Sequence, residues 1–256
     1  MARRKKTRMK SGDFILTILV LALVVFGVIM VFSSSYYSAI NDTGDPYAYL
    51  KRDIIWAAIG LGAMLFCAMF DYRLYAKAAP VILVVSTVLL LLLFTPLGVS
   101  RNNATRWIGV GDFTIMPGEI AKISAIIFVA WYLSRDPKRI RSFTRGILPM
   151  IGLCALDFGL IIMQPNLSTA ITVCGIIVGM MFVAGLNILY LVGIVGLGAM
   201  GITYMILTDE DGYRMKRLTS FLDPFQDPLG DGYQVIQSLL ALGSGGLFGV
   251  GLGKSI

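Results

Sequence analysis

The chain has 256 residues, of which 57% are hydrophobic and only 14% are charged, and its mean hydropathy is +0.79. Soluble domains carry about 25% charged residues, so this composition excludes an ordinary soluble enzyme and indicates an integral membrane protein. The formal net charge is +7, and the chain contains no histidine. Since histidine is the commonest metal ligand and general base, any acid–base chemistry would have to use carboxylates.

Apolar segments follow one another along most of the chain. A helix needs roughly 20 apolar residues to cross the hydrocarbon core of a bilayer. Seven segments come near that length: residues 14–32, 54–70, 78–94, 118–133, 146–163, 167–184 and 189–207. The predicted fold is therefore an all-α polytopic membrane protein with about seven transmembrane helices. Its predicted parts are a basic N-terminus (1–13), a helical bundle (14–207) and a polar loop (208–256).

The basic residues predict the orientation of the bundle. Lys and Arg cluster in the N-terminus and again between the fourth and fifth spans, at Arg135, Lys138, Arg139, Arg141 and Arg145. Loops rich in Lys and Arg stay in the cytoplasm, which places the N-terminus inside the cell and the polar loop outside. A charge cluster directly before an apolar span is a common insertion signal, so no nucleic acid is expected as a partner. The first span is long for a cleaved signal peptide, and we interpret it as a retained helix.

Three ionisable residues fall inside the predicted spans, where each is costly and usually marks function or a buried partner. Glu119 and Lys122 open the fourth span three residues apart, so their side chains lie on one helical face and can form an ion pair. Such a pair would serve equally well as a clasp between helices or as part of a site. Asp157 lies in the fifth span and needs a partner, for which Lys122 is the obvious candidate.

Polar motifs gather at the predicted outer face. The fifth span ends in QPNLST from Gln164, which can cap the next helix or bind a ligand. Arg106 and Trp107 precede the fourth span and suit either phosphate recognition or anchoring at headgroup level.

Residues 217–253 are the most informative stretch, because they are rich in Asp, Gly, Pro and Gln and should lie at the water interface. Within them, apolar residues at helical spacing predict an amphipathic segment on the outer leaflet. These residues are Val235, Ile236, Leu239, Leu240 and Leu242.

Three motifs occur together in the order found in one family. They are RWIGVGDFTIMPGEIAKI from Arg106, QPNLST from Gln164 and RLTSFLDPFQDPLGDGYQVIQSLLALGSGGLFGVGLGKS from Arg217. From the first span to its last residue the chain resembles the shape, elongation, division and sporulation (SEDS) proteins, the family of FtsW, SpoVE and RodA. The resemblance implies a ten-helix peptidoglycan glycosyltransferase of the bacterial cytoplasmic (inner) membrane, which polymerises lipid II during cell division, cell-shape maintenance or sporulation. The implied partners are lipid II, a class B penicillin-binding transpeptidase and other divisome or elongasome membrane proteins.

The resemblance also assigns roles to residues in this chain. It implies a substrate cavity shaped and charged by Arg106, Glu119 and Lys122. The outer rim of that cavity would be lined by Gln164, Pro165, Asn166 and Thr169. The loop over the lipid II headgroup would carry Arg217, Asp223, Asp227, Gln234 and Gln237. Asp223 and Asp227 each precede a proline, and capping of turns explains them slightly better than catalysis does.

The family's catalytic Asp follows the glycine-rich stretch, so it is expected beyond Ile256, and we interpret the 256 residues as part of a longer polymerase. No metal site is predicted among the residues, and a divalent cation, Mg²⁺ or Mn²⁺, is the one cofactor left open.

The chain departs from the family pattern at three places. The usual PSE reads Pro117-Gly118-Glu119, the usual QPDLGT reads QPNLST, and Asp157 stands where the family is apolar or has Pro. Asn166 therefore loses a charge that Asp157 could restore. Two further hypotheses remain beside the polymerase: a lipid II flippase or lipid II-binding membrane protein, and a non-catalytic scaffold of the division or sporulation machinery.

Overall fold

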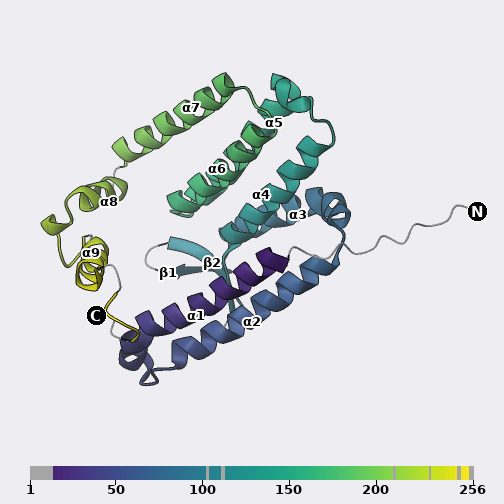
Figure 1. Ribbon diagram of the computed structural model, residues 1–256. Helices are drawn as coiled ribbons and strands as arrows, with labels where there is room; N and C mark the ends of the chain where they lie inside the picture. Colours follow the sequence, from purple (N-terminus) through teal and green to yellow (C-terminus); the bar gives the residue numbers. More distant parts are fainter. Residues whose placement is uncertain are drawn as a thin grey trace, which may run out of the picture. The chain divides into compact units, whose positions relative to one another are not determined.

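The computed structural model describes residues 14–101, 104–110, 113–209, 212–230, 232–246 and 249–253 (Figure 1). All seven predicted apolar segments are helical: α1 (Phe14–Thr43), α2 (Ala48–Met69), α3 (Tyr72–Leu92), α4 (Pro117–Ser134), α5 (Leu148–Ile162), α6 (Leu167–Val183) and α7 (Ile188–Leu207). The all-α polytopic membrane fold is confirmed. The chain divides into two compact units, Met1–Met69 with Ile206–Ile256, and Phe70–Met205.

Five helical segments of the described chain are long and apolar enough to cross a membrane: α1, α2, α3, the segment Phe143–Ile162 and α7. The apolar helix α6 is shorter than these. The charged residues Glu119 and Lys122 reduce the hydropathy of α4. Many large apolar side chains on these helices are exposed, as expected for a surface that faces lipid tails.

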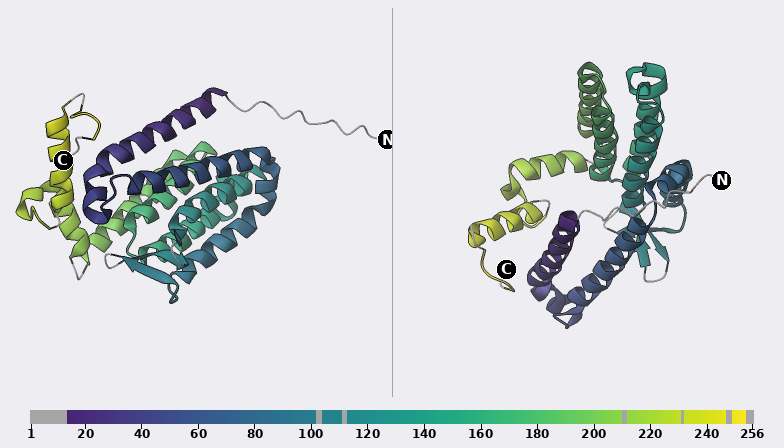
Figure 2. Two further views of the ribbon diagram at one scale, coloured as in Figure 1. Left: turned by 90° about the horizontal axis from the view of Figure 1, so that it is seen from below. Right: turned by 45° about the vertical axis from the view of Figure 1, so that its right-hand side comes forward.

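In the first unit, α1 and α2 lie side by side as a hairpin (Figure 1, Figure 2). The helix α1 continues past the predicted end at residue 32, because Ser34 and Ser35 donate their hydroxyls to Val31 O, at 3.2 and 2.6 Å, within the helix. In the turn, Asp45 Oδ1 accepts from Tyr47 N at 2.9 Å and Asp45 Oδ2 pairs with Lys51 Nζ at 2.7 Å. The hydrogen bond from Lys51 and that from Tyr47 N hold the pKa of Asp45 below its usual range.

The predicted polar loop contains helices of its own. They are α8 (Tyr213–Leu222), the 3-10 turn η3 (Pro224–Gln226) and α9 (Tyr233–Gly245). The amphipathic segment expected from its leucine spacing is α9, and Leu239, Leu240 and Leu242 are exposed on it. Its helical conformation is confirmed, and its position on the outer leaflet stays a prediction.

The second unit is built on packed helices, with α4 against α3 and α6, and α6 against α5. Buried residues recur every three or four positions along α4, α5 and α6. On α4 they include Ala121, Ala125, Val129 and Leu133, and on α6 they include Ala170, Val173, Ile177 and Met181. This spacing keeps the buried side chains on one helical face. The connection from α4 to α5 contains a 3-10 turn η1 (Arg139–Arg141) and a π-helical turn η2 (Phe143–Ile147).

The segment before α4, which the sequence analysis treated as an external loop, forms a small antiparallel sheet. Its strands are β1 (Gly98–Arg101), β2 (Ala104–Val110) and β3 (Phe113–Ile115), in the order β1-β2-β3. Ile108 of β2 pairs with Gly98 on one side and with Ile115 on the other. The aromatic and β-branched residues of the central strand favour this pairing, and the apolar periodicity used to find helices does not detect so short a sheet.

Candidate functional site

Arg106 of β2 connects the sheet to the turn between α5 and α6. Its Nη2 donates a hydrogen bond to the carbonyl oxygen of Pro165. The Nε of the same guanidinium is buried and has no hydrogen-bond partner among the described residues. A buried N–H without an acceptor is costly, and an oxygen brought to this atom would remove that cost.

The QPNLST turn is held by its own polar side chains. Asn166 Oδ1 accepts from Thr169 N at 3.3 Å and so caps the N-terminus of α6. Gln164 is buried, and its Nε2 donates to Leu90 O of α3 at 3.4 Å. Asn and Asp are equally good N-caps, so the departure from the family motif at Asn166 removes a charge and keeps the cap.

The N-termini of α4 and α6 approach each other at Gly118. A Cβ added at Gly118 would lie 3.0 Å from Thr169 Cγ2, so glycine allows this close approach. Helix N-termini carry a partial positive charge. The Arg106 guanidinium is tied to the same turn, so two helix N-termini and a cation lie near one another, an arrangement that suits a phosphate oxygen.

Glu119 and Lys122 form the predicted ion pair, with Lys122 Nζ 2.7 Å from Glu119 Oε2. The Lys122 side chain is 25% exposed and that of Glu119 is 56% exposed. The prediction of the pair is confirmed. Lys122 thus lies on the first turns of α4, partly shielded and neutralised by its neighbour.

Asp157 lies on the buried stripe of α5, between Leu153 and Ile161, and is only 2% exposed. Its Oδ2 has no hydrogen-bond partner within the described residues. The expectation that Lys122 pairs with Asp157 is wrong, because the Lys122 ammonium is engaged by Glu119 in its own helix. A carboxyl group in this place carries the full cost of burial without a compensating partner.

The predicted site residues of the last segment form a separate group in the other unit. Asp223 Oδ2 accepts from Gln226 Nε2 at 3.1 Å, and Asp227 Oδ1 accepts from Gly230 N at 3.1 Å. Both aspartates therefore stabilise turns, as the proline that follows each one suggested. Gln234 is exposed on α9, and the side chain of Arg217 lies outside the described part of α8.

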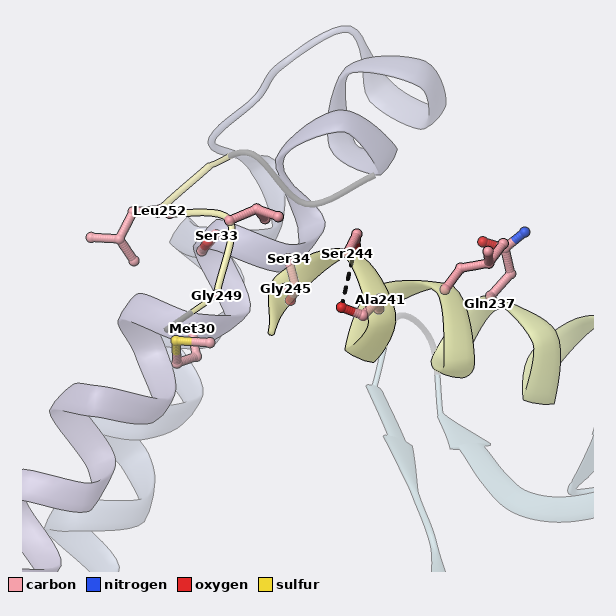
Figure 3. Close-up of a pocket in the computed structure, with 12 residues that line it drawn as sticks. Met30, Ser33, Ser34, Gln237, Ala241, Ser244, Gly245, Gly249 and Leu252 are labelled. Carbon is pink, nitrogen blue, oxygen red and sulfur yellow. Dashed lines mark hydrogen bonds between the residues drawn. The ribbon is translucent and has the colours of Figure 1, made fainter. Parts of the chain in front are cut away.

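Gln237 lines a cavity of about 510 Å³ within the first unit (Figure 3). Its walls come from α1, α9 and the chain at 249–252, and are mainly apolar. Gly253 N donates to Ser33 Oγ at 2.9 Å. The lining residues are Met30, Ser33, Ser34, Gln237, Leu240, Ala241, Ser244, Gly245, Gly249, Val250, Gly251 and Leu252. Such a groove can hold an apolar chain and offer hydroxyl and amide groups to a polar end.

The part that α1 plays in this cavity was not predicted from the sequence. The run Ser33-Ser34-Ser35 at the end of a long apolar segment was the available signal. In the described parts of the chain, no group of three or more His, Cys, Asp or Glu residues is placed to hold a metal ion.

Comparison with known proteins decides the family. The family model described as "Cell cycle protein", that of FtsW, RodA and SpoVE, matches residues 14–256. The chain belongs to this SEDS family. The stage V sporulation protein E of Bacillus subtilis (strain 168) is 41% identical over 250 residues, which are 97% of this chain and 68% of that protein.

A second SEDS relative is named as an enzyme. The probable peptidoglycan glycosyltransferase FtsW of Trichlorobacter lovleyi is 36% identical over 253 residues, or 98% of this chain and 66% of that protein. By family, the chain is assigned to the peptidoglycan glycosyltransferases. It spans about two thirds of the length of these relatives.

Two solved structures resemble the fold of this SEDS protein. One is described as "Structural coordination of polymerization and crosslinking by a peptidoglycan synthase complex". It matches with a TM-score of 0.72 and 30% identity, and the match covers 93% of this chain and 67% of that one. The other is the rod shape determining protein RodA of Thermus thermophilus, with a TM-score of 0.62 and 26% identity over 75% of this chain and 60% of that one.

Proposed function

We propose that this protein polymerises lipid II into glycan strands at the outer face of the bacterial cytoplasmic membrane. The observation that carries the proposal is the rim of the second unit, where the unpartnered Arg106 Nε lies by the turn that opens α6. Membership of a family with members named peptidoglycan glycosyltransferases gives the rim its substrate class.

The reaction joins the 4-oxygen of an acceptor sugar to the anomeric carbon of a donor. The bond from that carbon to the pyrophosphate oxygen breaks, the acceptor proton passes to a carboxylate base, and undecaprenyl pyrophosphate leaves with the negative charge. Arg106 and the two helix N-termini would stabilise the charge that develops on the leaving pyrophosphate. The Lys122 ammonium, which is paired with Glu119, would add a further hydrogen-bond donor.

None of the four carboxylates considered for the site, among the residues that the structure describes, is assigned as the catalytic base. Glu119 is held by Lys122, and Asp223 and Asp227 stabilise turns. Asp157 is buried among the packed helices.

A class B penicillin-binding transpeptidase is the proposed partner, alongside other divisome or elongasome membrane proteins. The support is the likeness to a structure from work on a complex that couples polymerization and crosslinking. A divalent cation, Mg²⁺ or Mn²⁺, would assist by binding the pyrophosphate. We expect the rate of polymerisation to fall when EDTA is added and to recover with excess Mg²⁺ or Mn²⁺.

The proposal is tested with the protein purified from its native membrane, with and without the transpeptidase. Fluorescent lipid II is added in detergent, and glycan strands are resolved by gel electrophoresis. Polymer formation that is lost in Lys122→Ala but kept in Lys138→Ala, a matched change in the loop after α4, would support the assignment. Lipid II binding without polymer would favour the binding or flippase hypothesis, and neither binding nor polymer would favour a scaffold.

A further inference from the structure

Two further cavities lie in the second unit, at the ends of α4 and α6 and the start of α7. One has a volume of about 280 Å³ and is largely apolar; we call it the apolar groove. Its lining residues are Val129, Ala130, Leu133, Ser134, Pro137, Ile140, Met180, Val183 and Ala184. The other has a volume of about 410 Å³ and is lined by Ile140, Arg141, Gly185, Asn187 and Tyr190; we call it the Arg141 pocket.

The two cavities are neighbours, because the buried side chain of Ile140 lines both. They also lie at one level, since α4 ends at Ser134, α6 ends at Val183 and α7 begins at Ile188. Transmembrane helices end near the water interface. A polar pocket next to an apolar groove at that level matches the two chemical halves of a membrane lipid.

The Arg141 pocket offers donors and no acidic group. The Arg141 side chain is exposed and forms no ion pair among the described residues. Asn187 Oδ1 accepts from Leu189 N at 2.9 Å, which leaves the Asn187 amide NH₂ to donate to a ligand. Tyr190, whose side chain carries a hydroxyl, is a third residue of the lining with a polar group.

The surrounding loop makes the pocket strongly basic. Of the other cations, Arg139 is 3.8 Å from Asp136 and lies over the Tyr132 ring at 5.2 Å, and Arg135 lies over the Trp131 ring at 4.7 Å. Asp136 is the one acidic residue from 135 to 145, and it is engaged by Arg139. The field at Arg141 therefore favours an anion.

We propose that this place binds an anionic phospholipid. The headgroup phosphate lies in the Arg141 pocket, where it accepts from the guanidinium and from the Asn187 amide, and one acyl chain lies in the apolar groove. A basic pocket between helices at the predicted cytoplasmic side is the kind of site that holds such headgroups. A free anion would leave the apolar groove unused, and a zwitterionic lipid would bring a second positive charge to Arg141.

The test is native mass spectrometry of the purified protein with phosphatidylglycerol or phosphatidylcholine, each carrying palmitoyl and oleoyl chains. We expect one phosphatidylglycerol to bind more tightly than phosphatidylcholine. Arg141→Gln should weaken phosphatidylglycerol binding about tenfold, the effect of losing about 1.4 kcal/mol, while Lys138→Gln, which makes the same charge change outside the lining, should weaken it less than about threefold.

Two more variants separate the sources of binding. Ala184→Trp fills the apolar groove without changing the charge and should also weaken phosphatidylglycerol binding. Arg141→Lys keeps the positive charge and should retain part of the phosphatidylglycerol affinity, which would show that the site tolerates substitution. Equal losses in Arg141→Gln and Lys138→Gln would overturn the proposal. Equal binding of the two lipids, or displacement of the lipid by millimolar inorganic phosphate, would overturn it as well. Thermal unfolding midpoints within about 2 °C of the parent verify that each variant is folded.

Discussion

The guanidinium of Arg106 donates a hydrogen bond to the carbonyl oxygen of Pro165, so a strand of the small sheet is tied to the turn that opens α6. The same guanidinium keeps a buried Nε without a partner. One side chain thus both ties the strand to the rim and keeps a second, unpartnered donor beside it. This double role sets Arg106 apart from cations that only anchor a membrane protein.

The role of Arg106 is tested by a substitution that keeps its positive charge. Arg106→Lys retains the charge but loses the forked donors, and we expect it to lower lipid II polymerisation at least tenfold, since hydrogen bonds to charged groups contribute about 1.5–3 kcal/mol. The measurement is the initial rate of strand formation. Arg135→Lys, in the loop after α4, is the control and should stay within twofold. Full activity of the Arg106→Lys variant would mean that Arg106 only anchors the protein at the membrane surface.

The ion pair of Glu119 and Lys122 is tested by exchanging its charges. In the double variant Glu119→Lys, Lys122→Glu the pair can re-form on the same face of α4, so the thermal midpoint should remain within a few degrees of the parent. The cation is then moved by three residues, and we expect polymerisation to fall at least tenfold. Retained activity would mean that the pair acts only as a clasp between helices.

The buried carboxyl of Asp157 should lower the free energy of unfolding. Asp157→Val replaces an unpartnered buried carboxyl with an apolar group of similar size and should raise the free energy of unfolding by about 1–3 kcal/mol. Leu153→Ala on the same stripe of α5 is the contrast and should lower it by about 2–5 kcal/mol. Both are read from thermal unfolding in detergent.

A substitution of Asp157 also tests whether its carboxylate replaces the charge that the family motif has at the position of Asn166. The structure places Asp157 on a packed helix face, so we expect Asp157→Asn to polymerise lipid II within twofold of the parent. A loss of tenfold or more would reinstate Asp157 as a functional charge.

Gly118 and Thr169 should be energetically coupled. Gly118→Ala gains helix propensity of up to about 1 kcal/mol, but its Cβ would meet Thr169 Cγ2 at 3.0 Å. We therefore expect Gly118→Ala to be neutral or destabilising in the parent and stabilising in a Thr169→Ser background, where Cγ2 is absent. A double-mutant cycle of unfolding free energies measures the coupling. If the effects of the two substitutions simply add, the two positions are not in energetic contact and the prediction is wrong.

Properties that depend on residues close in the sequence were predictable. Hydropathy located all seven helices of the bundle, and three-residue spacing predicted the Glu119 and Lys122 pair, because each depends on the geometry of one helix. Helical leucine spacing likewise predicted α9. Helix ends were less well predicted, as α1 shows, because its serines satisfy their hydroxyls inside the helix.

Contacts between distant segments were decided only by the tertiary structure. Nothing in the sequence places Arg106 against Pro165, Gln164 against Leu90 or Ser33 beside Gly253. The missing partner of Asp157 belongs to the same class, because whether a buried carboxyl meets a cation depends on how helices rotate and pack. The sequence by itself determined the membrane class, the helices and the family, since these follow from local periodicity and motif order. The arrangement of the rim, the grooves and the Arg141 pocket required the packing of segments far apart in the chain, which local periodicity does not encode.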